Sequence, residues 1–373
     1  MRVLIHAMPT KMGGAKRHLD NMMNALAKYS DDHTFIVLIN DQYDTSVFDS
    51  SIETLIYPVS YSSGIRRIIL DNLEVVKIIE REKIDLLISF SNIGPFKAGC
   101  KHILFEMNAL YFCKNIRHLF GFRQRIDFSI KRTLIDLSAR NADLIVTPSR
   151  SMMEHVSKTL GIPENRFRVL HHAMHTDFRK TAGSSRVFSD NRVSFLYPSH
   201  LARHKGVHTL LDALVVIKER DEKLLEKFEI VCTFARSDDP LYYDELMHTI
   251  KRHNLFETIR FIGYQPQESI NSLYAAADYM IYTTLCESFG FSMLEAKVFH
   301  LPALCSDIPI NREISKESAM YYRSDDPVDL ADKLEYFVKN RPDSFNFEDE
   351  LLEWRWEDYA GKLLQIIKEA ARG

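Results

Sequence analysis

The sequence predicts an α/β protein with two doubly wound, parallel-sheet domains. Three observations support this fold class. The chain has 373 residues, more than a single hydrophobic core usually organises. Short β-branched apolar runs alternate with amphipathic stretches, and the alternation occurs in both halves of the chain. A polar segment without periodicity, residues 179–191, separates the halves as a linker would.

Each half contains several apolar runs short enough to be strands. In the first half the expected strands are Arg2–Ala7, Phe35–Ile39, Ile84–Phe90, Ile103–Glu106 and Leu144–Thr147. In the second half they are Val193–Tyr197, Phe228–Thr233, Thr258–Ile262, Tyr279–Thr283 and Ala303–Ser306. Helical patterns lie between them, among them Arg17–Lys28, Ile68–Glu80, Val207–Lys218 and Asp329–Lys339. Such alternation predicts parallel sheets with helices on both faces.

Hydropathy and cysteine usage indicate the cellular compartment of the protein. No run of about 18 uncharged apolar residues is present, and the apolar start of the chain is too short for a signal peptide. The five cysteines lie far apart and form no CxxC pair. This pattern favours free thiols in a reducing cytoplasm over a disulfide framework or a zinc site.

The charge is distributed unevenly between the halves. Residues 1–180 contain 25 Lys and Arg against 19 Asp and Glu, a net of +6, whereas the remainder has a net of −9. A basic half suggests that it faces something anionic, such as nucleic acid or an anionic membrane.

The strongest local signal lies in the second half. A strand ending near Thr283 leads into a turn that contains Glu287, and a helix follows from about Phe291 with Glu295 one turn inside it. The start of a helix at the carboxyl end of a parallel strand favours an anion such as a diphosphate, because its N–H groups and its dipole point there. Carboxylates beside such a site can accept hydrogen bonds from sugar or ribose hydroxyls. Two glutamates at this spacing are, taken alone, more often a solvated helix face.

The whole string is more specific. Glu287-Ser-Phe-Gly-Phe-Ser-Met-Leu-Glu295-Ala resembles the E-x7-E motif of the family 4 glycosyltransferases, the glycosyl transferases group 1. The resemblance covers nearly the whole chain and is densest from about residue 141 to 315. It implies the GT-B fold, in which two Rossmann-like domains face a central cleft. The domains are then expected over residues 1–178 and 190–354, with a C-terminal helix, about 355–373, returning to the first.

The resemblance also assigns the donor site. It implies that Glu287 meets the hydroxyls of the donor sugar and that Glu295 meets the nucleotide ribose. The backbone around Phe289 approaches the sugar and the diphosphate. The donor-binding residues expected in this way are Gly13, Gly14, His200, Ser288, Phe289, Gly290, Phe291 and Glu295.

A basic loop follows the first strand of the second half. Lys205-Gly206 matches the family's G-R-L-x-x-x-K-G segment, but His200 stands in the place of its arginine. Arg203 could supply the missing guanidinium. Cations at the carboxyl end of a strand suit a departing nucleoside diphosphate, so Lys205, Arg203 and Glu287 are the expected catalytic residues. The histidines at 200, 204 and 208 should not share a helix face, and we expect no metal site and no cofactor.

The first half is expected to serve the acceptor. Gly13 and Gly14 follow the first strand, where glycines let the backbone approach a phosphate, and the absence of G-x-G-x-x-G argues against a dinucleotide oxidoreductase. Arg17 and Asn108 are the expected acceptor-side residues. Asn108 stands where many family members carry a histidine. An asparagine can position a hydroxyl but cannot carry a proton at neutral pH.

Residues 114–140 combine Lys and Arg with aromatic and aliphatic side chains. Such a segment can lie on an anionic bilayer, at the inner face of the plasma membrane. The alternative is a basic surface helix whose apolar side packs on its own sheet. Nucleic acid is not expected as a partner, because no recognised reader motif accompanies the charge.

The expected function is therefore a cytoplasmic, metal-independent, retaining glycosyltransferase of cell-surface polysaccharide biosynthesis. It would move a hexose-type sugar from a nucleoside-diphosphate donor to a glycan, glycolipid or lipid-linked acceptor; retention is implied by the family alone. Two alternatives stay open. One is a nucleotide-sugar 2-epimerase on the same fold, and the other is a non-catalytic subunit that binds nucleotide sugars.

Overall fold

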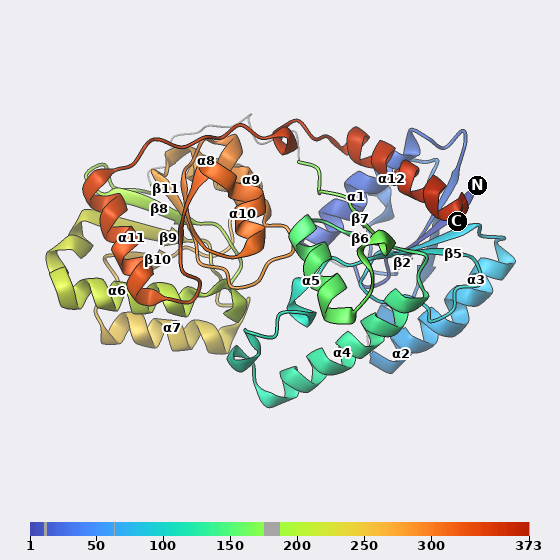
Figure 1. Ribbon diagram of the computed structural model, residues 1–373, viewed down its shortest axis with the longest axis horizontal. Coiled ribbons are helices and arrows are strands. Elements are labelled where there is room, and N and C mark those ends of the chain that lie inside the picture. The colour runs from blue at the N-terminus through green and yellow to red at the C-terminus, as the bar shows by residue number, and fades with distance from the viewer. Residues whose placement is uncertain (11–12, 63, 175–186, 373) are drawn as a thin grey trace. The chain divides into compact units, whose positions relative to one another are not determined.

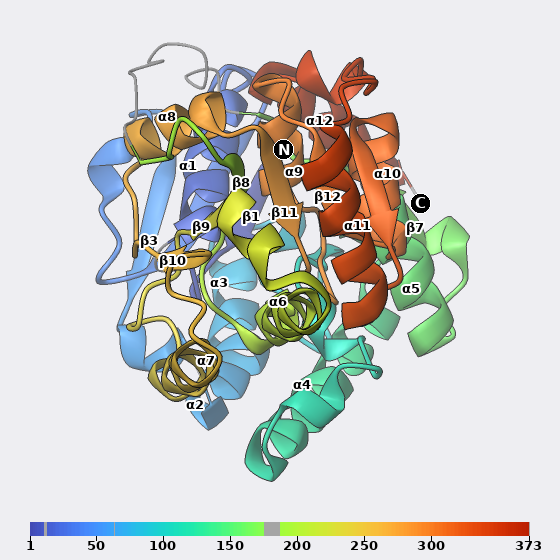
Figure 2. The same cartoon turned by 90° about the vertical axis from the view of Figure 1, so that its left-hand side faces the viewer.

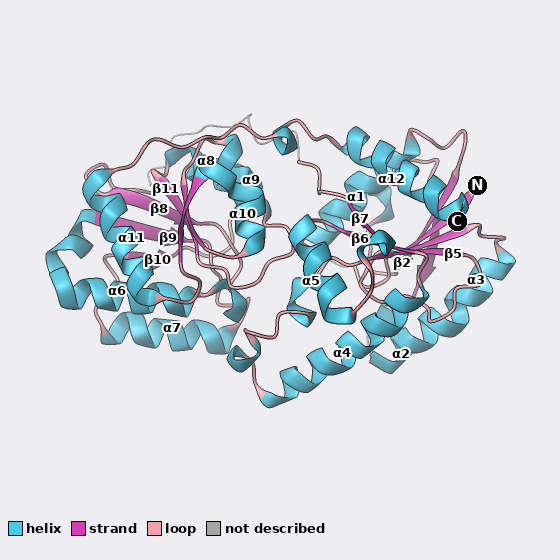
Figure 3. Ribbon diagram, in the orientation of Figure 1, coloured by secondary structure: helices cyan, strands magenta, loops and turns pink. Residues whose placement is uncertain are grey.

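The computed structural model describes residues 1–10, 13–62, 64–174 and 187–372. The chain forms two compact units. Unit 1 comprises Met1–Lys114, Phe122–Met174 and the chain from Trp354 onward; unit 2 comprises Asn115–Gly121 and the described part of His175–Glu353. Each unit contains one sheet with helices on both of its faces (Figures 1 and 3). The prediction of two parallel-sheet α/β domains is confirmed. Most of the predicted linker, residues 179–186, lies outside the described residues.

The sheet of unit 1 is parallel throughout, with the strand order β3-β2-β1-β4-β5-β6-β7. Its strands are β1 (Arg2–His6), β2 (Thr34–Asn40), β3 (Glu53–Tyr57), β4 (Leu86–Ser89), β5 (Lys101–Phe105), β6 (Leu144–Thr147) and β7 (Phe167–Val169). The helices are α1 (Gly13–Ala27), α2 (Gly64–Ile69), a π-helical turn (Leu70–Glu74), α3 (Val75–Arg81), α4 (Phe122–Asn141), α5 (Arg150–Leu160) and α12 (Trp356–Arg372).

The core of unit 1 explains this arrangement. Val3, Leu4 and Ile5 of β1 are all fully buried, because helices cover both faces of a parallel sheet. The last helix, α12, packs against α1 and buries Tyr359 and Leu363 in one core cluster with Val3 and Ile5.

The sheet of unit 2 is also parallel, with the order β10-β9-β8-β11-β12-β13. Its strands are β8 (Val193–Tyr197), β9 (Phe228–Cys232), β10 (Ile259–Phe261), β11 (Tyr279–Tyr282), β12 (Ala303–Ser306) and β13 (Ala319–Tyr322). The helices are α6 (Val207–Asp221), α7 (Pro240–Arg252), α8 (Gln267–Ala276), α9 (Phe291–Val298), α10 (Pro309–Ser315) and α11 (Pro327–Asn340). Helices α6 and α11 lie side by side (Figure 2).

All ten predicted strands are present, and their ends differ from the prediction by at most two residues. The edge strands β3, β7 and β13 were not predicted from the sequence. Edge strands bury less surface and need no continuous apolar run; in β3, for example, Glu53 and Thr54 are exposed.

The expectation that all cysteines are free thiols is wrong in part. Cys100, Cys232 and Cys305 are free, whereas Cys113 and Cys286 are disulfide-bonded. Scattered spacing is a compositional signal and does not exclude a disulfide. Within the described ranges, no helix has both the length and the apolar composition needed to cross a bilayer.

Candidate functional site

The candidate donor site lies at the switch point of the second sheet. Chain order runs outward from β8 on one side and from β11 on the other, and these two strands are hydrogen-bonded neighbours. In open α/β sheets, ligands bind outside the carboxyl ends of the strands at such a point. The loop after β8 contains a 3₁₀ turn, Arg203–Lys205, and the loop after β11 leads into α9.

Hydrogen bonds to backbone carbonyl oxygens hold these two loops together. The Thr283 hydroxyl donates to the carbonyl oxygens of Lys205 (2.9 Å) and Gly206 (3.0 Å), and the Leu285 N–H donates to the carbonyl of His204 (2.8 Å). Gly206 has φ of +66°, and a Cβ there would lie 2.2 Å from the Thr283 carbonyl oxygen. Only glycine allows this close approach. The position of Lys205 is therefore fixed by the β11 loop.

Lys205, Glu287 and Tyr282 form the centre of the site. The Lys205 Nζ lies 2.6 Å from the Glu287 Oε2 and donates to the Tyr282 hydroxyl at 3.1 Å. The Tyr282 hydroxyl in turn donates to the same carboxylate oxygen at 2.8 Å. The Lys205 side chain is only 6% exposed and that of Glu287 17%. An ammonium has three N–H donors, and these two contacts use two of them.

The charges of the pair are set by their surroundings. Burial opposes ionisation of Glu287, but the Lys205 ammonium outweighs it and lowers the pKa of the Glu287 carboxyl to about 2. Burial and the Lys205 charge lower the pKa of His204 to about 3 and also lower the pKa of His200. The site therefore presents a lysine cation, a carboxylate and two neutral imidazoles at neutral pH.

Helix α9 supplies the second half of the site. It begins after Gly290, which has φ of +86° and makes no side-chain cap. The N-terminal N–H groups of a helix favour an anion. Glu295 lies one turn inside α9 and accepts a 2.8 Å hydrogen bond from the Tyr274 hydroxyl, while the Ser288 N–H donates to Glu287 Oε1 (3.1 Å). The helix start predicted at Phe291 is confirmed.

Two expected residues occupy other positions around the basic loop. The Arg203 guanidinium pairs with Glu245 of α7 at 2.7 Å and lies over the ring of Tyr242, 4.7 Å from its centroid. Its side chain therefore points to α7 rather than to the Lys205–Glu287 pair. The ring of His200 lies 6.3 Å from that of His204.

Glycines and asparagines mark the corresponding edge of unit 1, at its switch point between β1 and β4. Gly13 and Gly14 begin α1 after β1, and Arg17 is exposed on the same helix. After β5, the Asn108 side chain accepts from the Leu110 N–H (3.0 Å) and caps a 3₁₀ turn. Its backbone N–H donates to the Asn92 side chain, which follows β4 (3.1 Å). Asn108 is thus held by local hydrogen bonds at the carboxyl ends of the strands.

Glu106, at the end of β5, is fully buried. Neither of its carboxylate oxygens has a hydrogen-bond partner among the described residues, and burial raises the pKa of this carboxyl well above its usual value. Burial without a partner favours the protonated, uncharged form of this carboxyl.

Tyr282, Tyr274 and Asn92 were not among the site residues predicted from the sequence. Tyr282 and Tyr274 look like ordinary apolar members of a strand and a helix, and their hydroxyls meet the two glutamates only in the folded chain. The position of Tyr282 at the carboxyl end of β11 was the available signal, because ligand-facing side chains gather there.

Two family models match the chain. Residues 12–178 match the model described as Glycosyltransferase Family 4, and residues 179–351 match the one described as Glycosyl transferases group 1. Together they span both units.

Curated relatives are distant. The O-antigen chain mannosyltransferase RfbU of Salmonella typhimurium is 22% identical over 208 residues, which are 55% of this chain and 53% of that protein. The O-antigen chain mannosyltransferase B of Escherichia coli is 24% identical over 189 residues, 49% of this chain and 48% of that protein. The chain thus spans about half the length of these two relatives.

Solved structures match over almost the whole chain. HepE of Anabaena, in complex with UDP and glucose, superposes with a TM-score of 0.71 at 15% identity over 99% of both chains. Sucrose-phosphate synthase of Thermosynechococcus elongatus has a TM-score of 0.75 at 14% identity, over 99% of this chain and 98% of that one. These matches show the two-domain GT-B fold.

Proposed function

The chain belongs to the family 4 glycosyltransferases, the glycosyl transferases group 1, and from its site we propose a reaction. It transfers a hexose-type sugar from a nucleoside-diphosphate donor to a glycan, glycolipid or lipid-linked acceptor. The observation that carries this proposal is the Lys205–Glu287 pair, bridged by Tyr282, at the carboxyl ends of β8 and β11.

In this proposal each group has a role that its contacts support. The remaining N–H of Lys205 and the N-terminal amides of α9 stabilise the negative charge that develops on the leaving diphosphate. Glu287 keeps the lysine in place and accepts hydrogen bonds from the donor sugar. Glu295, which is oriented by its hydrogen bond from Tyr274, accepts hydrogen bonds from the ribose hydroxyls. The acceptor is assigned to unit 1, to the edge formed by Gly13, Gly14, Arg17 and Asn108.

The proposed reaction retains the anomeric configuration and needs no metal. Lys205 and the start of α9 already supply positive charge where the diphosphate would leave, and this supports a reaction without a metal. Retention follows the family. Asn108 cannot carry a proton, so in this proposal the leaving phosphate receives the acceptor proton.

A lipid-linked acceptor would suit the exposed face of α4. Phe122, Ile126 and Ile130 recur at four-residue spacing and are 77%, 45% and 56% exposed. Buried residues of α4 lie only in its C-terminal half, from Ile135 onward, and Figures 1 and 2 show its N-terminal half extending away from the sheet of its unit. Arginines at positions 123, 125 and 132 accompany this stripe. We infer that α4 lies on the anionic inner face of the plasma membrane.

The membrane inference has its own test. Wild-type protein should float with vesicles containing anionic lipid, and Ile126→Asp/Ile130→Asp should not. Leu241→Asp, on α7 and 77% exposed, is the matched control and should float like wild type. Equal flotation of the α4 variant, or none by wild type, would reject the inference.

The central proposal is tested by donor binding and turnover. UDP-, GDP-, dTDP- and ADP-sugars are added in EDTA, and the melting temperature is measured, because a ligand of the native state raises it by mass action. One donor should raise it, and Lys205→Ala should abolish the rise. Conversion of that donor without an acceptor would indicate a 2-epimerase. Binding without turnover under any acceptor condition would indicate a non-catalytic subunit.

A further inference from the structure

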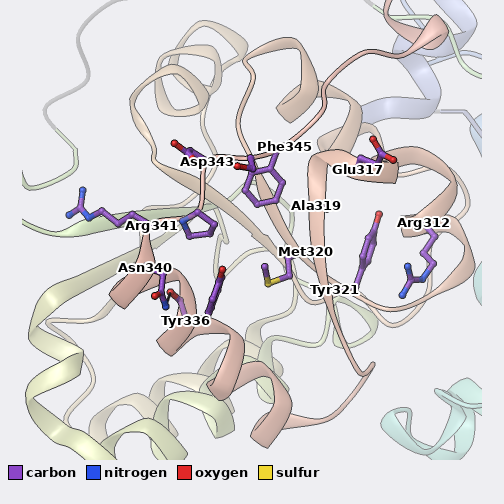
Figure 4. A pocket seen from close by; sticks show the side chains of 12 residues that line it. Arg312, Glu317, Ala319, Met320, Tyr321, Tyr336, Asn340, Arg341, Asp343 and Phe345 are labelled. Carbon is purple, nitrogen blue, oxygen red and sulfur yellow. Dashed lines mark hydrogen bonds between the residues drawn. The ribbon is translucent and has the colours of Figure 1, made fainter.

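A hollow lies at the edge of unit 2, and none of its walls is formed by the donor site. It has a volume of about 660 Å³ and is bordered by the edge strand β13, the C-terminal end of α11 and the following residues 341–345 (Figure 4). β12 separates β13 from β11, whose loop carries Glu287. No residue that lines the hollow belongs to the donor set.

Aromatic side chains form much of its wall. Tyr321, Tyr336 and Phe345 are arranged around Met320 (Figure 4). Tyr336 is 44% exposed, so part of its ring is accessible to a ligand. The ring of Phe345 is anchored on the buried Phe337, with a centroid distance of 6.3 Å. Such rings offer flat apolar surfaces of the size of a pyranose face, whose C–H groups gain from leaving water.

The polar groups of the hollow are balanced in charge. Arg312 and Arg341 are offset by Glu317 and Asp343. Arg312 is further neutralised by Asp307, which accepts hydrogen bonds of 2.6 and 2.7 Å from its guanidinium. The hollow therefore has no excess of either sign to attract a nucleic acid or another polyanion. It suits a neutral ligand.

Amide and ionic side chains can hydrogen-bond hydroxyl groups in the same place. Asn340 and Asp343 are exposed at the rim, and Arg341 follows the end of α11. These groups supply both donors and acceptors. Aromatic faces combined with such side chains match the alternating apolar and hydroxylated surfaces of a sugar chain.

An extended peptide added to β13 is the competing occupant. The chain itself already covers part of that edge, since the Asn346 N–H donates to the Glu317 carbonyl oxygen just before β13 (3.2 Å). A continuous added strand would have to displace this contact. The chemistry of the hollow thus favours the glycan.

We propose that this hollow binds a neutral glycan chain and keeps a growing acceptor or product on the enzyme during successive transfers. The proposal rests on the proposed glycosyltransferase function for its biological meaning, but the binding itself can be measured without any donor.

The experiment is electrophoresis of the folded full chain in native gels that contain mannan, galactan or dextran. At least one of these neutral polysaccharides should retard wild type. Tyr336→Ala should weaken the retardation at least about fivefold, as expected for loss of an aromatic contact face. Phe256→Ala is the matched control because Phe256 is also 44% exposed in unit 2. The retardation that the polysaccharide causes, measured against a gel without polymer, should be that of wild type in Phe256→Ala and also in Lys205→Ala.

Several outcomes would overturn the proposal. The proposal fails if no neutral polymer retards wild type, or if only the polyanion alginate does. It also fails if Tyr336→Ala is retarded as strongly as wild type, or if Lys205→Ala is no longer retarded. Capture of an extended peptide in place of a glycan would assign the hollow to strand addition. Failure of the transferase proposal appears separately, as polysaccharide binding without sugar transfer. Failure of this inference appears as transfer whose KM for a polymeric acceptor is unchanged in Tyr336→Ala.

Discussion

The Nζ of Lys205 lies 2.6 Å from the Oε2 of Glu287, although the two residues are 82 positions apart. The contact joins the loop after β8 to the loop after β11, and Tyr282 hydrogen-bonds to both partners. Because the pair is largely buried, removal of one partner would leave the charge of the other poorly solvated and without its counter-charge.

Lys205→Ala is expected to reduce kcat by about 10² to 10³, the usual loss when one donor to a developing negative charge is removed. Donor-induced thermal stabilisation should fall with it. Steady-state kinetics and melting curves measure the two effects. Lys339→Ala removes an equal charge from an exposed pair with Glu335 and is the control. A rate within twofold of wild type in Lys205→Ala would contradict the assigned role.

The assignment of Arg203 is a separate prediction. Its guanidinium is engaged by Glu245, so it can contribute to the diphosphate only after leaving that contact. If it does, Arg203→Ala should lower kcat, and Glu245→Ala, which releases the arginine, should not. Parallel kinetics of the two variants decide this, and unchanged kcat in Arg203→Ala would remove it from the catalytic set.

Gly206 and Gly263 provide a matched test of the loop contact. Both have positive φ, +66° and +77°, but only at Gly206 would a Cβ meet another atom, the Thr283 carbonyl oxygen. Gly263→Ala should cost about 1–2 kcal/mol of backbone strain. Gly206→Ala should cost about 1–3 kcal/mol more through overpacking. Denaturant unfolding measures both, and equal losses would show that the loops separate easily.

Glu106→Gln should stabilise the protein at neutral pH. Burial raises the pKa of Glu106 in the native state, so the unfolded chain releases this proton first. Stability is then lost as the pH rises above the unfolded pKa of about 4.5. Glutamine has no proton to release and removes that loss. Melting temperatures at pH 4 and pH 7.5 should differ less in Glu106→Gln than in wild type. An unchanged difference would indicate that Glu106 is ionised in the native state.

Buried histidines should make the protein sensitive to mild acid. Burial lowers the pKa of His102 to about 4, while in the unfolded chain it is about 6.5. Stability is complete above the unfolded value and is lost as the pH falls toward the folded one. Between pH 7 and pH 4 the free energy of unfolding should fall by about 1–3 kcal/mol less in His102→Gln than in wild type. His248→Gln, at an exposed position on α7, is the control. Melting temperature against pH gives the comparison, and identical profiles for His102→Gln and wild type would refute the prediction.

The sequence by itself determined the fold class and the internal strands. The central strands of a parallel sheet must be apolar on both faces, which leaves a continuous run that can be recognised, as in Phe35–Ile39. The start of α9 was also determined locally, because Gly290 and the residues around it specify the end of the turn. The E-x7-E string indicated the family for the same reason: its residues are contiguous.

Only the tertiary structure decided which side chains meet. Lys205 is paired by a carboxylate 82 positions away, and Arg203, two residues before it, is paired by Glu245 instead. Tyr282 became part of the site because β8 and β11 are neighbours in the sheet. The edge strand β13 and the hollow beside it left no periodic signal, because exposed edges are not required to be apolar. Such contacts depend on strand order and loop geometry, which a linear pattern of residue types does not record.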